Sequence, residues 1–269
     1  MKLFYRKYGE SGPPLIIVHG LYGSGDNWVT IARELAEKFE VYVVDQRNHG
    51  QSPHSEVHDY PAMREDLREF MDDQDIEKAV LIGHSMGGKT IMCFAVEWPE
   101  RVASLISVDI APKSYNNLAL ASRKAPNHSG IIDALLALDV KNAESREELD
   151  LALRPRIGSS RIRGFLLKNV GRDSSGRFSW EINLEALYNN LDKIFAGLDA
   201  ATIPAGGITG FPVLFISGAD SDYIQAKDHL LIRSIFPVAE IVTIPGAGHW
   251  VHAEQPALLV KTITYFLEN

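Results

Sequence analysis

Residues 83–90 carry two overlapping motifs that would support different chemistry. Gly83 to Gly87 fits the G-x-S-x-G nucleophile elbow of serine hydrolases, in which Ser85 would be the nucleophile. Gly83 to Thr90 also fits G-x-x-x-x-G-K-[ST], the P-loop that binds nucleotide phosphates. Both motifs lie between a strand and a helix, so local secondary structure does not separate them. Other parts of the chain must decide between acyl-bond cleavage and nucleotide binding.

A serine elbow makes specific demands on the residues around it. A serine hydroxyl is a weak nucleophile, so it must be exposed on a tight turn beside a base. The turn brings Gly83 and Gly87 into close contact, where side chains would clash. The N–H of Met86 would point at the developing oxyanion, and the N-terminus of the following helix would add positive potential. Under this interpretation Lys89 and Thr90 lie in the first helical turn and do no chemistry.

Two other stretches could supply the remaining parts of a hydrolase site. His19-Gly20-Leu21 follows an apolar strand, and we expect the N–H of Leu21 to be a second oxyanion donor. Pro245 to Trp250 is a glycine-containing loop after the last predicted strand, where His249 could accept the proton of Ser85. An ordinary glycine turn and an ordinary loop histidine are the alternatives, since the chain has nine histidines. The position of His249 after the last strand favours the hydrolase.

The elements that would position these residues alternate between strands and helices. Segments with apolar residues at helical spacing separate short apolar runs, which predict buried strands at 15–18, 41–44, 79–82, 105–108, 211–216 and 239–244. Continuous apolar strands with helices between them favour a parallel sheet that is covered on both faces. The sequence therefore predicts an α/β fold with a mostly parallel, doubly wound sheet.

The alternation stops between the fourth and fifth predicted strands. Almost a hundred residues there contain helical stripes but no buried strand. We therefore expect a core domain of residues 1–112 and 210–269, with a helical insertion at 113–209. Loops at the carboxyl ends of parallel strands carry ligands, so the insertion is predicted to be a cap, or lid, over the site. A structural helical subdomain with no role in binding is the alternative.

Composition argues against several classes of protein. Lys and Arg number 27 against 35 Asp and Glu, and the net charge of −8 disfavours nucleic acid and anionic membranes as partners. The one cysteine, Cys93, excludes an intrachain disulfide and disfavours a cysteine-based metal site. The N-terminus has no apolar signal-peptide region, and no apolar run reaches about 18 residues. These features predict a cytoplasmic protein with no membrane span.

The nucleotide-binding alternative needs more than the eight residues of its motif. A P-loop enzyme also needs an acidic residue at the end of another buried strand to hold magnesium, and Asp109 could supply it. A P-loop usually follows the first strand of its domain, whereas two strand–helix units precede Gly83 here. No basic residue is identifiable as an arginine finger. The chain as a whole therefore favours the elbow.

Four stretches together resemble the α/β-hydrolase superfamily over essentially the whole chain. They occur in the superfamily's order and are His19-Gly20, Asp45 to Ser52, Gly83 to Gly88, and Gly246 to His249. Val108 to Pro112, with the stretches 19–24 and 26–28, looks more particularly like the small esterases related to bacterial YbfF and the abhydrolase-domain-11 group. This resemblance implies a carboxylesterase with an α/β-hydrolase fold and a helical cap, active on short acyl esters. It implies no metal and no organic cofactor.

The catalytic acid has two candidate positions. The position that is usual in the superfamily follows the fifth predicted strand and holds Ser221, with Asp220 and Asp222 beside it. In the esterases that the chain resembles, the acid instead follows the strand after the elbow helix, where Asp109 lies. An unpaired carboxylate at that strand end would be costly, and a hydrogen bond to His249 would account for it. We favour Asp109, with a helix or loop cap as its non-catalytic alternative.

Together these patterns predict a two-step acyl transfer to water. Ser85, His249 and Asp109 would form the triad, and the N–H groups of Leu21 and Met86 would hold the oxyanion. A thioesterase or a carbon–carbon bond hydrolase on the same triad is the alternative within enzymes. A ligand receptor with a slow hydrolase site, or a P-loop nucleotide-binding protein, is the alternative from another class. The predicted partner is a small-molecule ester, and the sequence leaves the oligomeric state open.

Overall fold

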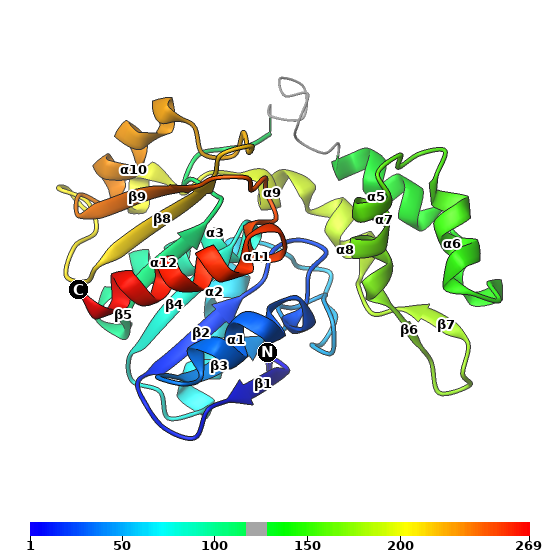
Figure 1. Ribbon diagram of the computed structural model, residues 1–269, viewed down its shortest axis with the longest axis horizontal. Helices are drawn as coiled ribbons and strands as arrows, with labels where there is room; N and C mark the ends of the chain where they lie inside the picture. The colour runs from blue at the N-terminus through cyan, green and yellow to red at the C-terminus, as the bar shows by residue number, and fades with distance from the viewer. Residues whose placement is uncertain (117–127) are drawn as a thin grey trace.

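A seven-stranded sheet crosses the centre of the molecule in the computed structural model, which describes residues 1–116 and 128–269 (Figure 1). The strand order is β1-β3-β2-β4-β5-β8-β9. The strands are β1 (Tyr5–Tyr8), β2 (Pro14–Val18), β3 (Glu40–Val44), β4 (Ala79–His84), β5 (Val102–Val108), β8 (Val213–Gly218) and β9 (Ala239–Ile244). Each neighbouring pair is parallel except β1 and β3, which are antiparallel. The predicted α/β fold with a mostly parallel sheet is confirmed.

One strand of this sheet escaped prediction. β1 is an edge strand of sequence Tyr-Arg-Lys-Tyr, and most of its residues are only partly buried. An edge strand has one neighbour and one solvated side, so it does not need the continuous apolar run that marks a central strand. β2 shows the contrast, because Ile16 and Ile17 point to opposite faces of the sheet and both are fully buried.

Helices cover both faces of the sheet. One apolar layer joins the sheet to α1 and α12, which lie together in front of it in Figure 1. A second apolar layer joins the other face to α2, α3 and α10. The helices of the core are α1 (Val29–Leu35), α2 (Tyr60–Asp73), α3 (Met86–Glu97), α10 (His229–Ile235), α11 (Val251–Glu254) and α12 (Pro256–Glu268). Short 3-10 helices of the core are η1 (Gly25–Trp28), η2 (Pro99–Arg101) and η6 (Ala226–Asp228).

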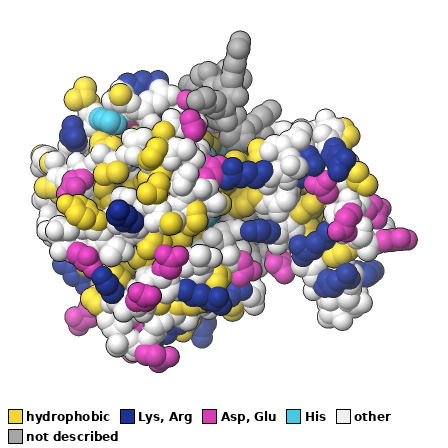
Figure 2. Space-filling view, in the orientation of Figure 1, with side chains coloured by type: hydrophobic (Ala, Val, Ile, Leu, Met, Phe, Trp, Pro, Cys, Tyr) yellow, Lys and Arg dark blue, Asp and Glu magenta, His cyan; other side chains and the backbone are white. Residues whose placement is uncertain are grey.

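The chain between β5 and β8 forms the helical insertion, and its part from 128 to 189 stands out as a lobe to the right of the core in Figures 1 and 2. Its elements are α5 (His128–Leu136), η3 (Val140–Asn142), α6 (Arg146–Leu153), α7 (Ser160–Leu166), η4 (Leu167–Asn169), β6 (Val170–Arg172), β7 (Phe178–Trp180), α8 (Leu184–Asn189), α9 (Leu191–Phe195) and η5 (Ala200–Thr202). The two short strands form an antiparallel hairpin apart from the main sheet. This hairpin was not predicted, because three-residue strands are too short to give a distinct apolar pattern.

The insertion packs on one particular edge of the core. Most of its buried apolar residues form one cluster with Leu21, which follows β2, and Met86, which follows β4. Tyr22, Tyr60 and Met63 from the core complete that contact. The insertion therefore lies over the carboxyl ends of the parallel strands, where ligands bind in open α/β sheets. Within residues 1–116 and 128–269, no helix is long and apolar enough to cross a membrane.

Candidate active site

Ser85 sits on a tight turn between β4 and α3. Its backbone has φ 53° and ψ −119°, a region that a residue with a side chain rarely adopts. A Cβ on Gly83 would lie 2.4 Å from the carbonyl oxygen of Gly87, and a Cβ on Gly87 would lie 2.2 Å from that of Val18. Such distances leave no room for a side chain at either position. The glycines of the motif are therefore required by the sharp turn that presents the serine hydroxyl.

Three predicted residues from distant parts of the chain meet at this turn. Ser85 Oγ lies 3.0 Å from His249 Nε2. The other ring nitrogen, His249 Nδ1, lies 2.8 Å from Asp109 Oδ2. With the ring proton on Nδ1, the carboxylate accepts it and Nε2 keeps a lone pair for the serine hydroxyl proton. The arrangement has the geometry that a general base needs to activate a serine.

Asp109 is fully buried at the carboxyl end of β5. Its Oδ1 accepts the N–H of Gly218 at 3.0 Å, and its Oδ2 accepts the Ser221 hydroxyl as well as the His249 ring. Three donors around one carboxylate stabilise the charged form of a group that burial alone would disfavour. The backbone φ of Asp109 is 51°, in the left-handed region that a residue with a side chain rarely adopts.

Asp220 and Ser221, beside and at the usual superfamily acid position, make other contacts in the structure. Asp220 is exposed, and its backbone N–H donates to the carbonyl oxygen of Ala247. Ser221, which stands where the acid usually lies, donates its hydroxyl to Asp109. Ser221, which replaces the usual acid, thus belongs to the same hydrogen-bonded group as the Asp109 carboxylate. The pairing could not be found from the sequence, because the two residues are 112 positions apart.

The two residues predicted to hold the oxyanion lie beside Ser85. Leu21 and Met86 are buried and line the same cavity as the serine. The loop that carries Leu21 comes close because Gly20 has no side chain: a Cβ there would lie 3.0 Å from Ser85 Cβ and 2.8 Å from His84 Nδ1. Both backbone N–H groups therefore belong to segments that flank the serine, as the prediction requires.

Contacts that the sequence did not reveal hold the His249 loop in place. His84 Nε2 lies 2.8 Å from the carbonyl oxygen of His249, and the Gly248 N–H donates to Glu254. Tyr223 stacks on the His249 ring with centroids 3.7 Å apart and planes at 15°. Burial keeps the pKa of His84 well below its ordinary value, so its ring is neutral at pH 7. These contacts restrict rotation of the imidazole between Ser85 and the carboxylate.

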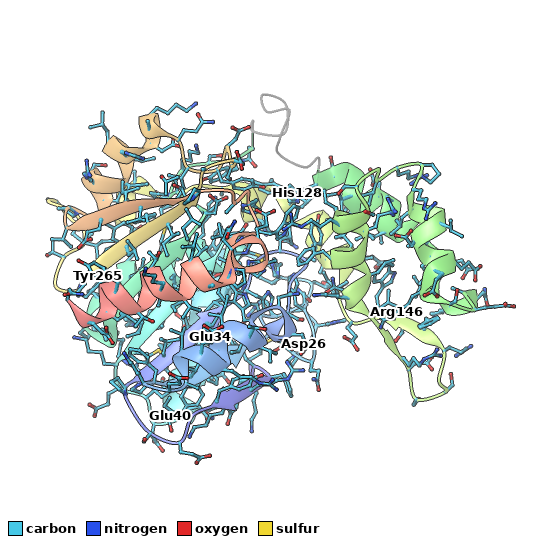
Figure 3. The ribbon with its side chains drawn as sticks, in the orientation of Figure 1. Asp26, Glu34, Glu40, His128, Arg146 and Tyr265 are labelled. Carbon is cyan, nitrogen blue, oxygen red and sulfur yellow. The ribbon has the colours of Figure 1, made fainter. Side chains whose placement is uncertain are left out.

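A small, partly enclosed cavity lies beside Ser85. Its volume is about 20 Å³, little more than one water molecule needs. Most of the residues that line it are apolar or aromatic. They are Leu21, Tyr60, Met86, Lys89, Ile110, Tyr115, His128, Ile194, Phe195 and Tyr223. His128, labelled in Figure 3, lies where the insertion meets the core. Residues of the insertion, Ile194 and Phe195 among them, form part of the wall, so the insertion borders the space next to Ser85.

The side chains that a P-loop would use are engaged inside the protein. Lys89 and Thr90 are each 1% exposed. Lys89 Nζ donates to the carbonyl oxygen of Ala196, and the Thr90 hydroxyl donates to Gln46 Oε1 at 2.9 Å. Both lie in the first turn of α3, as predicted, but Lys89 also lines the cavity beside Ser85. Among the described residues, no group of three His, Cys, Asp or Glu side chains is placed to hold a metal ion.

Asp45 and Arg47, just after the end of β3, tether neighbouring loops to the core. Asp45 accepts the backbone N–H groups of Gly25 at 2.7 Å and Gln51 at 2.9 Å. Arg47 forms a buried ion pair with Asp66, with Nε 2.6 Å from Oδ2. These bonds fix the loops next to the segment that carries Leu21.

Comparison with known proteins shows similarity to the α/β-hydrolase fold family and, within it, to esterases and a lipase. The family model described as alpha/beta hydrolase fold matches residues 13–256. The chain is 37% identical to the sn-1-specific diacylglycerol lipase ABHD11 of Mus musculus, over 95% of this chain and 81% of that protein. It is 36% identical to the esterase YbfF of Escherichia coli, over 97% and 95%. A solved marine microorganism esterase superposes with a TM-score of 0.93 at 46% identity and covers 98% of this chain and 99% of its own.

Proposed function

The chain belongs to the α/β-hydrolase fold family and is a hydrolase of carboxylic esters, and from this premise we propose that Ser85, His249 and Asp109 are its catalytic triad. The observation that carries the proposal is the continuous path from Ser85 Oγ through the His249 ring to the Asp109 carboxylate, with links of 3.0 and 2.8 Å. A nucleophile, a base and an orienting acid in this order are the parts that acyl transfer needs.

In the first step Ser85 Oγ attacks the ester carbonyl carbon while its proton passes to His249 Nε2. The imidazolium that forms is stabilised by Asp109, which accepts the Nδ1–H throughout. Collapse of the tetrahedral intermediate breaks the bond to the alcohol oxygen, which takes the proton from Nε2 as it leaves. The product is an acyl-enzyme on Ser85.

The oxyanion of each tetrahedral intermediate would be held by the backbone N–H groups of Leu21 and Met86. Met86 is the first residue of α3, so its N–H has no partner within the helix and lies at the positive end of the helix dipole. One oxyanion donor is worth about 10²–10³ in kcat in enzymes where it has been removed.

In the second step water enters the position that the alcohol has left. His249 Nε2 takes a proton from this water as it attacks the acyl carbon, and the proton then returns to Ser85 Oγ as the acid departs. Every proton movement uses one ring nitrogen, so the neutral His249 ring is restored at the end of the cycle.

Residues 113–209 would act as a cap on a core of residues 1–112 and 210–269. The support is the apolar cluster that joins the insertion to Leu21 and Met86, beside the serine. Because the cavity is small, short acyl groups are the substrates that need the least displacement of the cap. A cytoplasmic location stays a prediction from the sequence.

Replacement of Ser85 by alanine tests the proposed nucleophile. We expect Ser85→Ala to lose nearly all turnover of p-nitrophenyl acetate and to keep about 10³-fold catalysis over water from the oxyanion donors and substrate binding. The matched control is Ser234→Ala, which removes an exposed hydroxyl on α10 and should turn over normally. If Ser85→Ala hydrolyses the ester at the rate of the control, the proposed triad is wrong.

A further inference from the structure

Lys89 is a buried amine beside the reactive serine. Its side chain is 1% exposed, and its Nζ donates to the carbonyl oxygen of Ala196 and, at 3.4 Å, to that of Phe195. These carbonyls lie at the end of α9, in the insertion. The amine also faces the rings of Tyr115, at 4.7 Å from the centroid, and Tyr60, at 5.7 Å. Lys89 therefore joins the elbow helix to the insertion at the cavity.

The Lys89 amine has no carboxylate counter-ion in the protein. No Asp or Glu among residues 1–116 and 128–269 forms an ion pair with it, and residues 117–127 contain no Asp or Glu. Two other buried cations are paired: Arg47 lies 2.6 Å from Asp66, and Arg163 lies 2.7 Å from Asp150. Burial lowers the pKa of Lys89 to about 7. A buried cation without a counter-ion is costly, so this position calls for a functional reason.

The location of Lys89 relative to Ser85 indicates which part of a substrate it would meet. The two residues are four apart at the start of α3, so they lie on one side of the helix, and both line the cavity. His249, which would protonate the departing alcohol, contacts Ser85 Oγ and stacks on the Tyr223 ring, which forms part of the cavity wall. The alcohol would therefore leave on the His249 side, and the acyl chain would extend into the cavity toward Lys89.

The tyrosine hydroxyls of the cavity already have hydrogen-bond partners. The Tyr60 hydroxyl donates to the carbonyl oxygen of Ile194, and the Tyr115 hydroxyl donates to that of Tyr223. The Tyr223 hydroxyl lies 3.1 Å from His128 Nε2. A lysine ammonium carries three N–H donors, and the two carbonyls of α9 accept at most two of them. Lys89 therefore retains a donor for a substrate atom.

We propose that Lys89 is the specificity-determining residue of this esterase and that it binds a carboxylate on the far end of the substrate's acyl chain. The preferred substrate class is then a half-ester of a dicarboxylic acid. The inference rests on the proposed function, because it places the acyl group in the cavity of Ser85. The substrate carboxylate supplies the missing counter-ion and accepts the N–H of Lys89 that the α9 carbonyls leave free.

The test compares two esters that differ at one end of the acyl chain. Monoethyl glutarate and ethyl valerate both carry a five-carbon acyl group, which ends in a carboxylate in the first and in a methyl group in the second. Hydrolysis of each is followed at pH 6.5 by chromatography of the released ethanol. We expect wild type to favour monoethyl glutarate in kcat/KM by about 10- to 100-fold, the range of a charge-assisted hydrogen bond.

Lys89→Met removes the charge and keeps an unbranched side chain of similar length. We expect the ratio of kcat/KM for monoethyl glutarate to kcat/KM for ethyl valerate to fall to about one, chiefly through a higher KM for monoethyl glutarate. Lys89→Arg keeps a cation and should retain part of the preference. The rate on ethyl valerate also reports whether each variant is folded.

Three results would overturn the inference. Equal losses on both esters in Lys89→Met would show that Lys89 only supports the fold of the cavity. Equal kcat/KM of wild type on both esters would show that no carboxylate is recognised. Hydrolysis that persists in Ser85→Ala would instead remove the proposed function, and with it the premise of the inference.

Discussion

Replacement of Asp109 by asparagine changes one atom of the carboxylate and reverses its hydrogen-bonding role. In the native protein, Oδ2 accepts from both His249 Nδ1 and the Ser221 hydroxyl, while Oδ1 accepts from the Gly218 N–H. An asparagine has one acceptor oxygen and one NH₂ donor. With its oxygen toward Gly218, the NH₂ group meets the ring, so the imidazole must present a lone pair at Nδ1. Its proton then sits on Nε2, which can no longer accept the proton of Ser85.

The opposite orientation of the asparagine has its own cost. With its oxygen toward His249, the NH₂ group faces the N–H of Gly218, and two buried donors oppose each other. An unmade buried hydrogen bond of this kind costs about 1–3 kcal/mol. The side chain is fully buried, so water does not relieve the conflict. We therefore expect Asp109→Asn to lower kcat by about 10³–10⁴-fold, as expected when the base is held in the wrong tautomer.

The assay is steady-state hydrolysis of p-nitrophenyl acetate by purified variants, together with thermal unfolding to show that each is folded. Asp220→Asn and Asp222→Asn are the matched controls, because they make the same chemical change on either side of Ser221, which holds the superfamily's usual acid position. Both should keep a kcat within about twofold of wild type. A variant of Asp109 with a near-normal rate, beside a slow variant at 220 or 222, would refute the assignment of the acid.

Two predictions concern the stability of the fold that carries the site. Gly87→Ala places a Cβ 2.2 Å from the carbonyl oxygen of Val18, so denaturant titration should show a loss of about 3 kcal/mol or more in the free energy of unfolding. Gly164→Ala, in α7 with nothing within 4 Å, is the control and should be as stable as wild type or more stable by up to about 1 kcal/mol. Burial lowers the pKa values of His58, His128 and His252 to about 3 each. An unfolded histidine has a pKa of about 6.5, so below this pH the unfolded chain binds protons that the folded chain does not bind. The free energy of unfolding should therefore fall as pH drops from 6.5 toward 3, by on the order of 1 kcal/mol per histidine per pH unit. Urea titrations at pH 7 and pH 5 with equal midpoints would contradict this.

Sequence patterns predict the parts of this protein that local physics determines. Central strands such as 15–18 and 79–82 are buried on both faces, so they must be apolar throughout and are visible in the sequence. The glycines at 83 and 87 are visible for a similar reason, since the turn at Ser85 excludes side chains there. Family resemblance supplied the choice of Asp109, which local patterns alone left open against 220 and 222.

Features that depend on contacts between distant residues could not be predicted in this way. The hydrogen bond from Ser221 to Asp109 joins positions whose relation appears only after β5 and β8 pair. Lys89 looked like an ordinary residue of a helical turn, because its partners Phe195 and Ala196 are more than a hundred positions away. The edge strand β1 lacks the apolar run of a central strand, so its pairing with β3 was also invisible.

The central claim is that Ser85 is a serine activated by His249. Its most direct test is to label the protein with a fluorophosphonate probe, which reacts with activated serines, and to map the modified peptide by mass spectrometry. We expect the probe on Ser85 alone, with labelling strongly reduced in His249→Ala. A probe on another residue, or undiminished labelling of Ser85 without the histidine, would contradict the mechanism.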